Sequence, residues 1–135
     1  MLLQMLQLLF HMIWSDPMRR LILEMGMGND LYGMDYTKAS KRAVEDAFRH
    51  STLSIFNSLN LDSSKMQVKV TVAVVEPEKV DCEAVAKVIP RGVATVNAVR
   101  GGQNIADPMN ETAHVIATAA VEAYYPINQS DWKLT

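Results

Sequence analysis

The sequence predicts an α/β domain, a two-layer sandwich in which a mixed four-stranded sheet carries helices on one face. Three observations support this prediction. A chain of 135 residues, 49% hydrophobic and 21% charged, is typical of one soluble domain with a substantial core. Segments with alternating apolar residues are separated by segments with apolar residues every three or four positions. Their order (strand, helix, strand, helix, strand, strand) is typical of a sheet covered on one side.

The first strand is expected at residues 20–27. Leu21, Leu23 and Met25 alternate there, which places all three on one buried face. The glycines around and after this segment are expected to end the strand.

A long helix is expected over residues 36–59, with Asp35 as its N-cap. Small and apolar residues recur every fourth position and define the buried stripe. These residues are Ala39, Ala43, Ala47, Ser51 and Ile55.

The rest of the domain is read in the same way. The expected elements are a strand over 66–74, a helix over 80–89 capped by Asp81, a strand over 93–102 and a strand over 113–125. A loop over residues 101–110 is expected between the last two strands, as a binding lid or an oligomer contact.

The sheet face away from the helices is expected to contact another subunit or to line a pocket. Small and scattered polar residues are assigned to it: Ala94, Ala98, Ala117, Ala119, Lys69, Thr71 and Thr118. Because an uncovered face would expose more apolar area than monomers usually do, we expect a homo-oligomer, and a trimeric ring is the favoured assembly.

The chain divides into an apolar extension (1–17), a single domain (18–125) and a tail (126–135). The apolar run at the N-terminus is too short to span a bilayer. Three interpretations stay open: a helix that packs on the domain or a neighbour, a weak membrane-surface segment, or an extension before a functional start at Met18.

Charge and cysteine content narrow the class of protein. A net charge of −2 and a pI near 5.9 give no electrostatic basis for nucleic-acid binding. Cys82 is the single cysteine, which excludes an intramolecular disulfide and fits the reducing cytoplasm. No two histidines have metal-ligand spacing, so no metal is expected. No other cofactor is expected either. Membrane association is not expected, because the apolar N-terminal run carries no Lys or Arg.

The stretch "EMGMGNDLYGMDYTKAS" (24–40) carries the first candidate site. It is not a dinucleotide fingerprint, because Leu31 stands where the third glycine is required. Glu24 or Asp30 is the candidate acid/base, with Tyr32 or His114 assisting. Turn chemistry explains the same residue types equally well, so both interpretations stay open.

A second group of candidates comes from the other segments. His114 opens the last strand and is suited to acid–base work. Lys38 and the loop after the third strand would fix a small anionic substrate through charge and backbone amides. The candidate loop residues are Arg100, Gly101, Gly102, Gln103 and Asn104.

The pattern E-x-G-x-G-x-D-L-x-G-x-D-x-T-K-A, from Glu24 to Ala39, resembles the small "Lin" family of conserved hypothetical proteins of bacteria and fungi. The segments "P-E-x-V-D", "V-x-G-G" and "A-A-V" extend the likeness over about residues 18–125. The resemblance implies a fold and a site location, but no reaction. Members commonly carry His where Tyr32 stands, so Tyr32 is expected to act as a hydrogen-bond donor. The element order also resembles the trimeric chorismate-mutase-like fold, whose pockets lie between subunits.

Two functions are therefore expected. The first is a cofactor-independent enzyme that carries out an isomerase, cyclase or lyase-type proton transfer on a small polar or anionic metabolite, in a pocket between subunits. The alternative is a non-catalytic oligomeric module that binds a ligand or a protein, with the apolar N-terminus as its interaction element.

Overall fold

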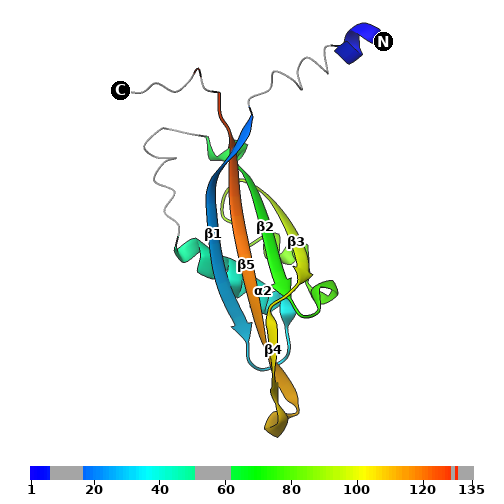
Figure 1. The fold of residues 1–135 in the computed structure, drawn as a ribbon, viewed down its shortest axis with the longest axis vertical. Helices are drawn as coiled ribbons and strands as arrows, with labels where there is room; N and C mark the ends of the chain where they lie inside the picture. Colours follow the sequence, from blue (N-terminus) through cyan, green and yellow to red (C-terminus); the bar gives the residue numbers. More distant parts are fainter. Residues whose placement is uncertain (7–16, 51–61, 129, 131–135) are drawn as a thin grey trace.

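The computed structural model describes residues 1–6, 17–50, 62–128 and 130. It confirms a mixed α/β fold, built on an open sheet of five strands (Figure 1). The strands are β1 (Met18–Asp30), β2 (Gln67–Val74), β3 (Val93–Arg100), β4 (Gln103–Asp107) and β5 (Thr112–Pro126). The helices that follow β1 are α2 (Tyr36–Arg49) and α4 (Cys82–Ala86), with 3₁₀ turns at Ser63–Lys65, Pro77–Lys79 and Pro108–Asn110. Residues 2–6 are also helical.

The prediction of four strands was wrong, because the expected loop over residues 101–110 contains β4. β4 pairs antiparallel with the first part of β5, where Gln103 lies opposite Ile116 and Asp107 opposite Thr112. The two strands form a hairpin at the end of the sheet where β1 stops, which we call the distal end (Figure 1).

β5 is the central strand of the sheet, in the order β1-β5-β2-β3. β1 pairs antiparallel along one side of β5, and β2 pairs antiparallel along the other. β3 pairs parallel with β2, as expected for strands joined by a crossover through a helix. β1 and β3 are therefore the outer strands of the main sheet.

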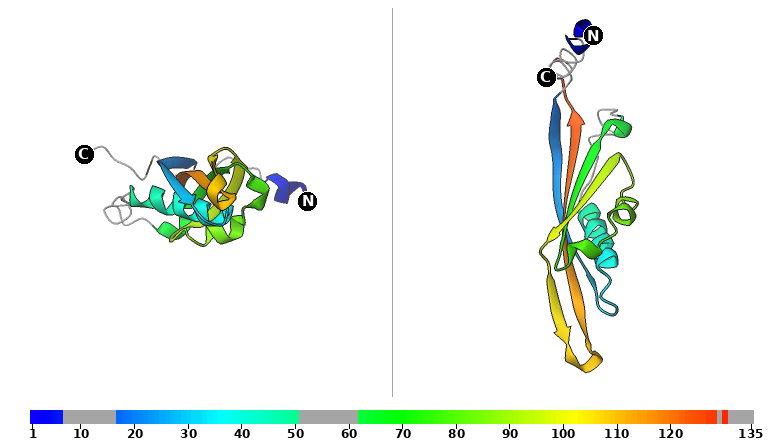
Figure 2. Two further views of the ribbon diagram at one scale, coloured as in Figure 1. Left: turned by 90° about the horizontal axis from the view of Figure 1, so that it is seen from below. Right: turned by 90° about the vertical axis from the view of Figure 1, so that its right-hand side faces the viewer.

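α2 and α4 lie on the same face of the sheet (Figure 2). The predicted alternation of β2 is confirmed: Met66, Val68, Val70, Val72 and Val74 are all buried under these helices. The opposite face, which we call the open face, carries no helix among the described residues.

β1 is longer than expected, and its phase was predicted wrongly. Leu23, Met25 and Met27 are 47%, 66% and 58% exposed, so they lie on the open face. Gly26 and Gly28 do not end the strand but face α2 from inside it. A Cβ atom on either glycine would collide with the backbone of Ala43. The glycines therefore allow the helix to approach the strand closely, which sets the phase of β1.

The small residues assigned to the uncovered face also lie elsewhere. Ala94 and Ala98 pair with Val68 and Val72, which places them toward the helices. Ala117 and Ala119 are buried in the core. Alternation then places the polar residues of the same strands on the open face, as expected: Lys69, Thr71 and Thr118.

Both predicted helix caps are confirmed. Asp35 accepts a hydrogen bond from the Lys38 amide at 3.0 Å, and Asp81 accepts one from the Ala84 amide at 3.1 Å. α2 ends at Arg49, and its predicted continuation through residues 51–59 lies outside the described residues.

Of the apolar N-terminal extension, the structure describes residues 1–6 and residue 17. The leucine and methionine side chains of residues 1–6 are exposed. Within the described part of the chain, no helix is both long enough and apolar enough to cross a membrane.

Candidate functional site at the distal end

Asp30 ends β1 at the distal end and is only 4% exposed. Its Oδ2 accepts the backbone N–H of Asp35 at 2.9 Å. Its Oδ1 lies 4.0 Å from Lys38 Nζ and 3.8 Å from an Arg42 nitrogen. The carboxylate thus closes the 31–35 turn and pairs with two cations of α2, so the geometry gives Asp30 a structural task.

The turn between β1 and α2 needs this support. Gly33 has a φ of +138° and Met34 a φ of +51°, in a region that side chains with a Cβ rarely adopt. Thr37 then accepts the Asp81 amide at 2.9 Å, which ties the start of α4 to α2. Most of the motif from Glu24 to Ala39 therefore has a role in folding.

Glu24 does not join Asp30. It lies six positions earlier on the same strand, a separation of roughly 20 Å at about 3.3 Å per residue. Its Oε1 lies 3.3 Å from the backbone N–H of Met25, within hydrogen-bond reach. The two carboxylates, each predicted as the acid/base, are thus too far apart to belong to one small site.

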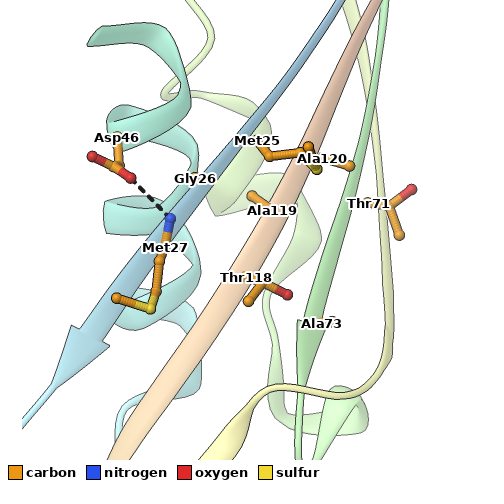
Figure 3. A pocket seen from close by; sticks show the side chains of 9 residues that line it. All are labelled: Met25, Gly26, Met27, Asp46, Thr71, Ala73, Thr118, Ala119 and Ala120. Carbon is orange, nitrogen blue, oxygen red and sulfur yellow. Dashed lines mark hydrogen bonds between the residues drawn. The ribbon is translucent and has the colours of Figure 1, made fainter. Parts of the chain in front are cut away.

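Two side chains of α2 reach around the outer edge of β1, and neither was among the predicted site residues. Asp46 accepts the Met27 N–H at 2.9 Å (Figure 3), and Arg42 donates to the Asn29 carbonyl at 2.6 Å. The hydrogen bond from Met27 is the main cause that lowers the pKa of Asp46. Arg42 and Asp46 are four positions apart, so the sequence shows that they share one face of α2. It does not show that this face meets the edge of β1.

A polar network ties β4 to the helix layer. The Tyr36 hydroxyl donates to Glu76 at 2.7 Å and accepts from Asn104 Nδ2 at 2.7 Å. Lys79 donates to Glu76 at 3.2 Å. Burial raises the pKa of Tyr36, and the hydrogen bond from Tyr36 lowers the pKa of Glu76. The buried Asn104 Oδ1 has no hydrogen-bond partner among the described residues.

Tyr32, Asp107 and His114 form a group that we call the distal cluster. His114 Nδ1–H donates to the Leu31 carbonyl at 2.8 Å, and Nε2 lies 3.5 Å from Asp107 Oδ2. The Tyr32 ring stands edge-on to the imidazole, with centroids 6.3 Å apart. Two of the predicted site residues are thus brought together, and Asp107 joins them as a residue that was not among the predicted site residues.

Asp107 is an ionised acceptor in this cluster. Asn110 Nδ2 donates to Asp107 Oδ2 at 2.8 Å, and this hydrogen bond is the main cause that lowers the carboxyl pKa. The Asp107 side chain is 16% exposed and the His114 side chain 29% exposed, so both can be reached from solvent.

The remaining predicted binding residues do not converge on the cluster. Arg100 ends β3 as an exposed residue, and Gln103 begins β4 as another. A Cβ on Gly101 would lie 2.8 Å from the Ala73 Cβ, and one on Gly102 would lie 2.8 Å from the Ala73 carbonyl oxygen. The two glycines therefore allow close approach of the chain to itself, where β3 passes into β4.

The open face has a shallow hollow of about 460 Å³ near the middle of the sheet (Figure 3). Its side chains are apolar or small, with few polar atoms. On the open face it is lined by Met25, Met27, Thr71, Ala73, Thr118 and Ala120.

Metal ligands are not grouped in the described part of the chain. No three of its His, Cys, Asp and Glu side chains are placed so that they could hold an ion together. Cys82 is a partly buried free thiol in α4.

Comparison with known proteins places this chain in a family. Residues 20–123 match the family described as "Conserved hypothetical protein (Lin0512_fam)", and the chain belongs to it. A solved structure from Nostoc punctiforme, described as a FtsZ-like protein of unknown function, is 36% identical to this chain. The similarity covers 84% of this chain and 100% of that one, with a TM-score of 0.72. None of the curated proteins matches the chain.

Proposed function

We propose that the protein is a homo-oligomeric binding domain. Neighbouring copies cover the open face of the sheet, and the distal cluster binds a small polar ligand at the subunit boundary. The observation that supports this most is the exposure of Leu23, Met25 and Met27 beside small residues, on a face that carries no helix among the described residues.

The size of the open face is suited to such an interface. Four strands about 4.8 Å apart, each contributing about seven residues of roughly 3.3 Å, span roughly 450 Å² of flat sheet. Because side chains protrude from the sheet, its accessible area is larger than this flat area and approaches the ~800 Å² per partner of a standard interface. Thr71, Ala73, Thr118 and Ala120 leave room for the side chains of a facing sheet about 10 Å away.

The distal cluster lies on the same face as this apolar surface. Side chains alternate along β5, and Val115 and Ala117 are buried toward the helices. His114 therefore shares the open face with Thr118 and Ala120. Asp107 lies opposite Thr112 in the β4–β5 ladder, on that same face. A neighbouring copy that covers the open face would therefore place the margin of its own interface beside the distal cluster.

The charge of the cluster favours one class of ligand. Asp107 is ionised and accepts hydrogen bonds, so it would bind a hydroxyl, amine or amide N–H and would repel an anion. The exposed Tyr32 ring offers a flat apolar contact. We therefore expect a polar ligand that carries hydrogen-bond donors and a small apolar part.

A second candidate function is proton transfer at the same cluster, as an isomerase, cyclase or lyase. The pairing of His114 with Asp107 favours it, since an imidazole beside a carboxylate is a common acid–base arrangement. In the described conformation both ring nitrogens face oxygen atoms. Catalysis would thus require His114 to turn toward the substrate and leave Leu31 or Asp107.

Native mass spectrometry tests the assembly. We expect a homo-oligomer, with the trimer favoured by the architectural resemblance, and we expect Met25→Lys to dissociate it. Glu45→Lys is the control, because Glu45 is exposed on α2, the helix that covers the opposite face of the sheet. A monomeric wild type, or equal masses for wild type and Met25→Lys, would overturn the proposed interface.

Ligand binding is tested separately with a set of small polyols, amino alcohols and amides, by calorimetry on the assembled protein. Asp107→Asn and Tyr32→Ala should each weaken the binding of any ligand found. Enzymatic turnover that is lost in His114→Gln, with ligand affinity retained, would favour the second candidate.

A further inference from the structure

The outer edge of β1 is protected against pairing with another strand. Asp46 binds the outward N–H of Met27, and Arg42 binds the outward carbonyl of Asn29. Natural sheets cover their edges in this way to prevent association through unpaired backbone groups. This edge is therefore closed by side chains of the protein's own helix.

In the described ranges of the chain, no side chain covers the outer edge of β3 in this way. The Val93 N–H donates to Met66 O and the Gly101 N–H donates to Val74 O, each at 2.9 Å, so the odd-numbered residues of β3 face β2. Alternation then turns the backbone groups of the even-numbered residues outward. These outward residues are Ala94, Val96 and Ala98. Their outward N–H and C=O groups have no partner in the part of the chain that the structure describes.

The sequence of this edge is close to its own reverse. Residues 93–99 read V-A-T-V-N-A-V, symmetric about Val96 except for the exchange of Thr95 and Asn97. The segment contains no charge and no proline, which are usual means of blocking an edge. We infer that β3 pairs antiparallel with β3 of a second copy, about a twofold axis at Val96.

This register is self-complementary on both its backbone and its side chains. Val96 faces Val96 of the partner subunit, and Ala94 faces the partner's Ala98, so that about six backbone hydrogen bonds form. On the open face Thr95 lies opposite the partner's Asn97, and the two side chains can hydrogen-bond. Val93 and Val99, which are 63% and 37% exposed, lie opposite each other across the axis.

The inference uses a different surface from the proposed function and does not rest on it. The open face packs sheet against sheet, whereas β3 extends one sheet into the next. Both contacts can exist in one assembly, and each is removed by its own substitutions.

Charge pairing across the axis provides the test. In Thr95→Asp/Asn97→Asp, each introduced carboxylate lies opposite another, which opposes association. In Thr95→Asp/Asn97→Lys, each carboxylate lies opposite an ammonium, which supports it. The two variants share position 95, where the carboxylate lies beside Lys69 of β2 in the same copy, so folding is matched. They differ only at position 97.

Hydrogen exchange at rising protein concentration gives the main readout, and sedimentation equilibrium gives the mass. We expect the amides of Ala94, Val96 and Ala98 to be protected in wild type and in the Asp/Lys variant. In the Asp/Asp variant they should exchange at least tenfold faster, with a twofold loss of mass. The β2-facing amides of residues 95, 97 and 99 report the integrity of the fold.

Fast exchange of the even-numbered amides in wild type would overturn the inference. So would equal protection in the two variants, because pairing across the axis requires them to differ. Neither result bears on Met25→Lys, whose effect on mass reports the open face alone.

Discussion

The backbone of Gly28 in β1 lies so close to Ala43 of α2 that a Cβ atom at position 28 would collide with the Ala43 amide nitrogen. The contact involves the backbone of both residues, so a rotamer change cannot relieve it. Helix and strand are thus packed at a distance that a side chain at position 28 would not allow. This relationship explains why two glycines stand inside a strand, where glycine is otherwise unfavourable.

Gly28→Ala should strongly destabilise the fold. Inserting a methyl group into a packed core costs about 1–3 kcal/mol, and more where the obstacle is backbone. We expect a loss of about 3 kcal/mol or more in the free energy of unfolding, measured by urea denaturation. Ala43→Gly should not rescue the variant, because the atom in conflict is the backbone nitrogen. A stable Gly28→Ala protein would show that α2 can move away from β1.

Asp30→Asn and Glu24→Gln should separate structural from chemical roles. Asp30 is buried against Lys38 and Arg42, so loss of its charge should cost about 1–3 kcal/mol of unfolding free energy. Glu24 is partly exposed, and Glu24→Gln should change stability by less than about 0.5 kcal/mol. Denaturant unfolding and a binding assay are run on both. An Asp30→Asn protein of unchanged stability that has lost binding would restore Asp30 as a site residue.

The network around Tyr36 should give the stability a dependence on pH at both extremes. The pKa of Tyr36 is raised in the fold, so its contribution is complete below the unfolded value near 10 and is lost as pH rises above it. The pKa of Glu76 is lowered from 4.5, so its contribution is complete above that value and is lost as pH falls. Tyr36→Phe should make both declines shallower, as measured by thermal unfolding from pH 3 to 11.

A matched control for Tyr36→Phe is Tyr32→Phe. Tyr32 is 77% exposed and has no hydrogen bond to Glu76, so this substitution should leave the acid and alkaline declines unchanged. Identical pH profiles for wild type and Tyr36→Phe would show that other groups control them.

The elements that the sequence predicted well are those with strong local signals. β2 alternates valine with polar residues over its whole length, and Asp35 and Asp81 precede their helices at the cap position. Such features depend on the residue and its near neighbours, so one chain is enough to read them. Membership of the Lin family followed from the long motif after Glu24, and it too is confirmed.

The predictions that failed depended on contacts between distant segments. Leu23 and Met25 do share one face, but it is the open face, because Gly26 and Gly28 face α2. Leu21 lies beside the irregularity between Arg20 and Ile22 and packs against the core. β4 was read as a loop, since its strand character comes from pairing with β5. Asp107 joins His114 only through the hairpin, and no local signal in the sequence shows that these side chains are close.

The Asp46 carboxylate should prevent another strand from pairing with the outer edge of β1. Asp46→Ala removes the acceptor for the Met27 N–H, so this amide should exchange faster with solvent and the edge of β1 should become available for pairing. Asp46→Asn keeps an acceptor oxygen at the same place and should keep the amide protected. We expect Asp46→Ala to form additional high-mass species as concentration rises, measured by light scattering, while Asp46→Asn behaves like wild type. Slow exchange at Met27 in Asp46→Ala would show that this edge is protected by something other than the carboxylate.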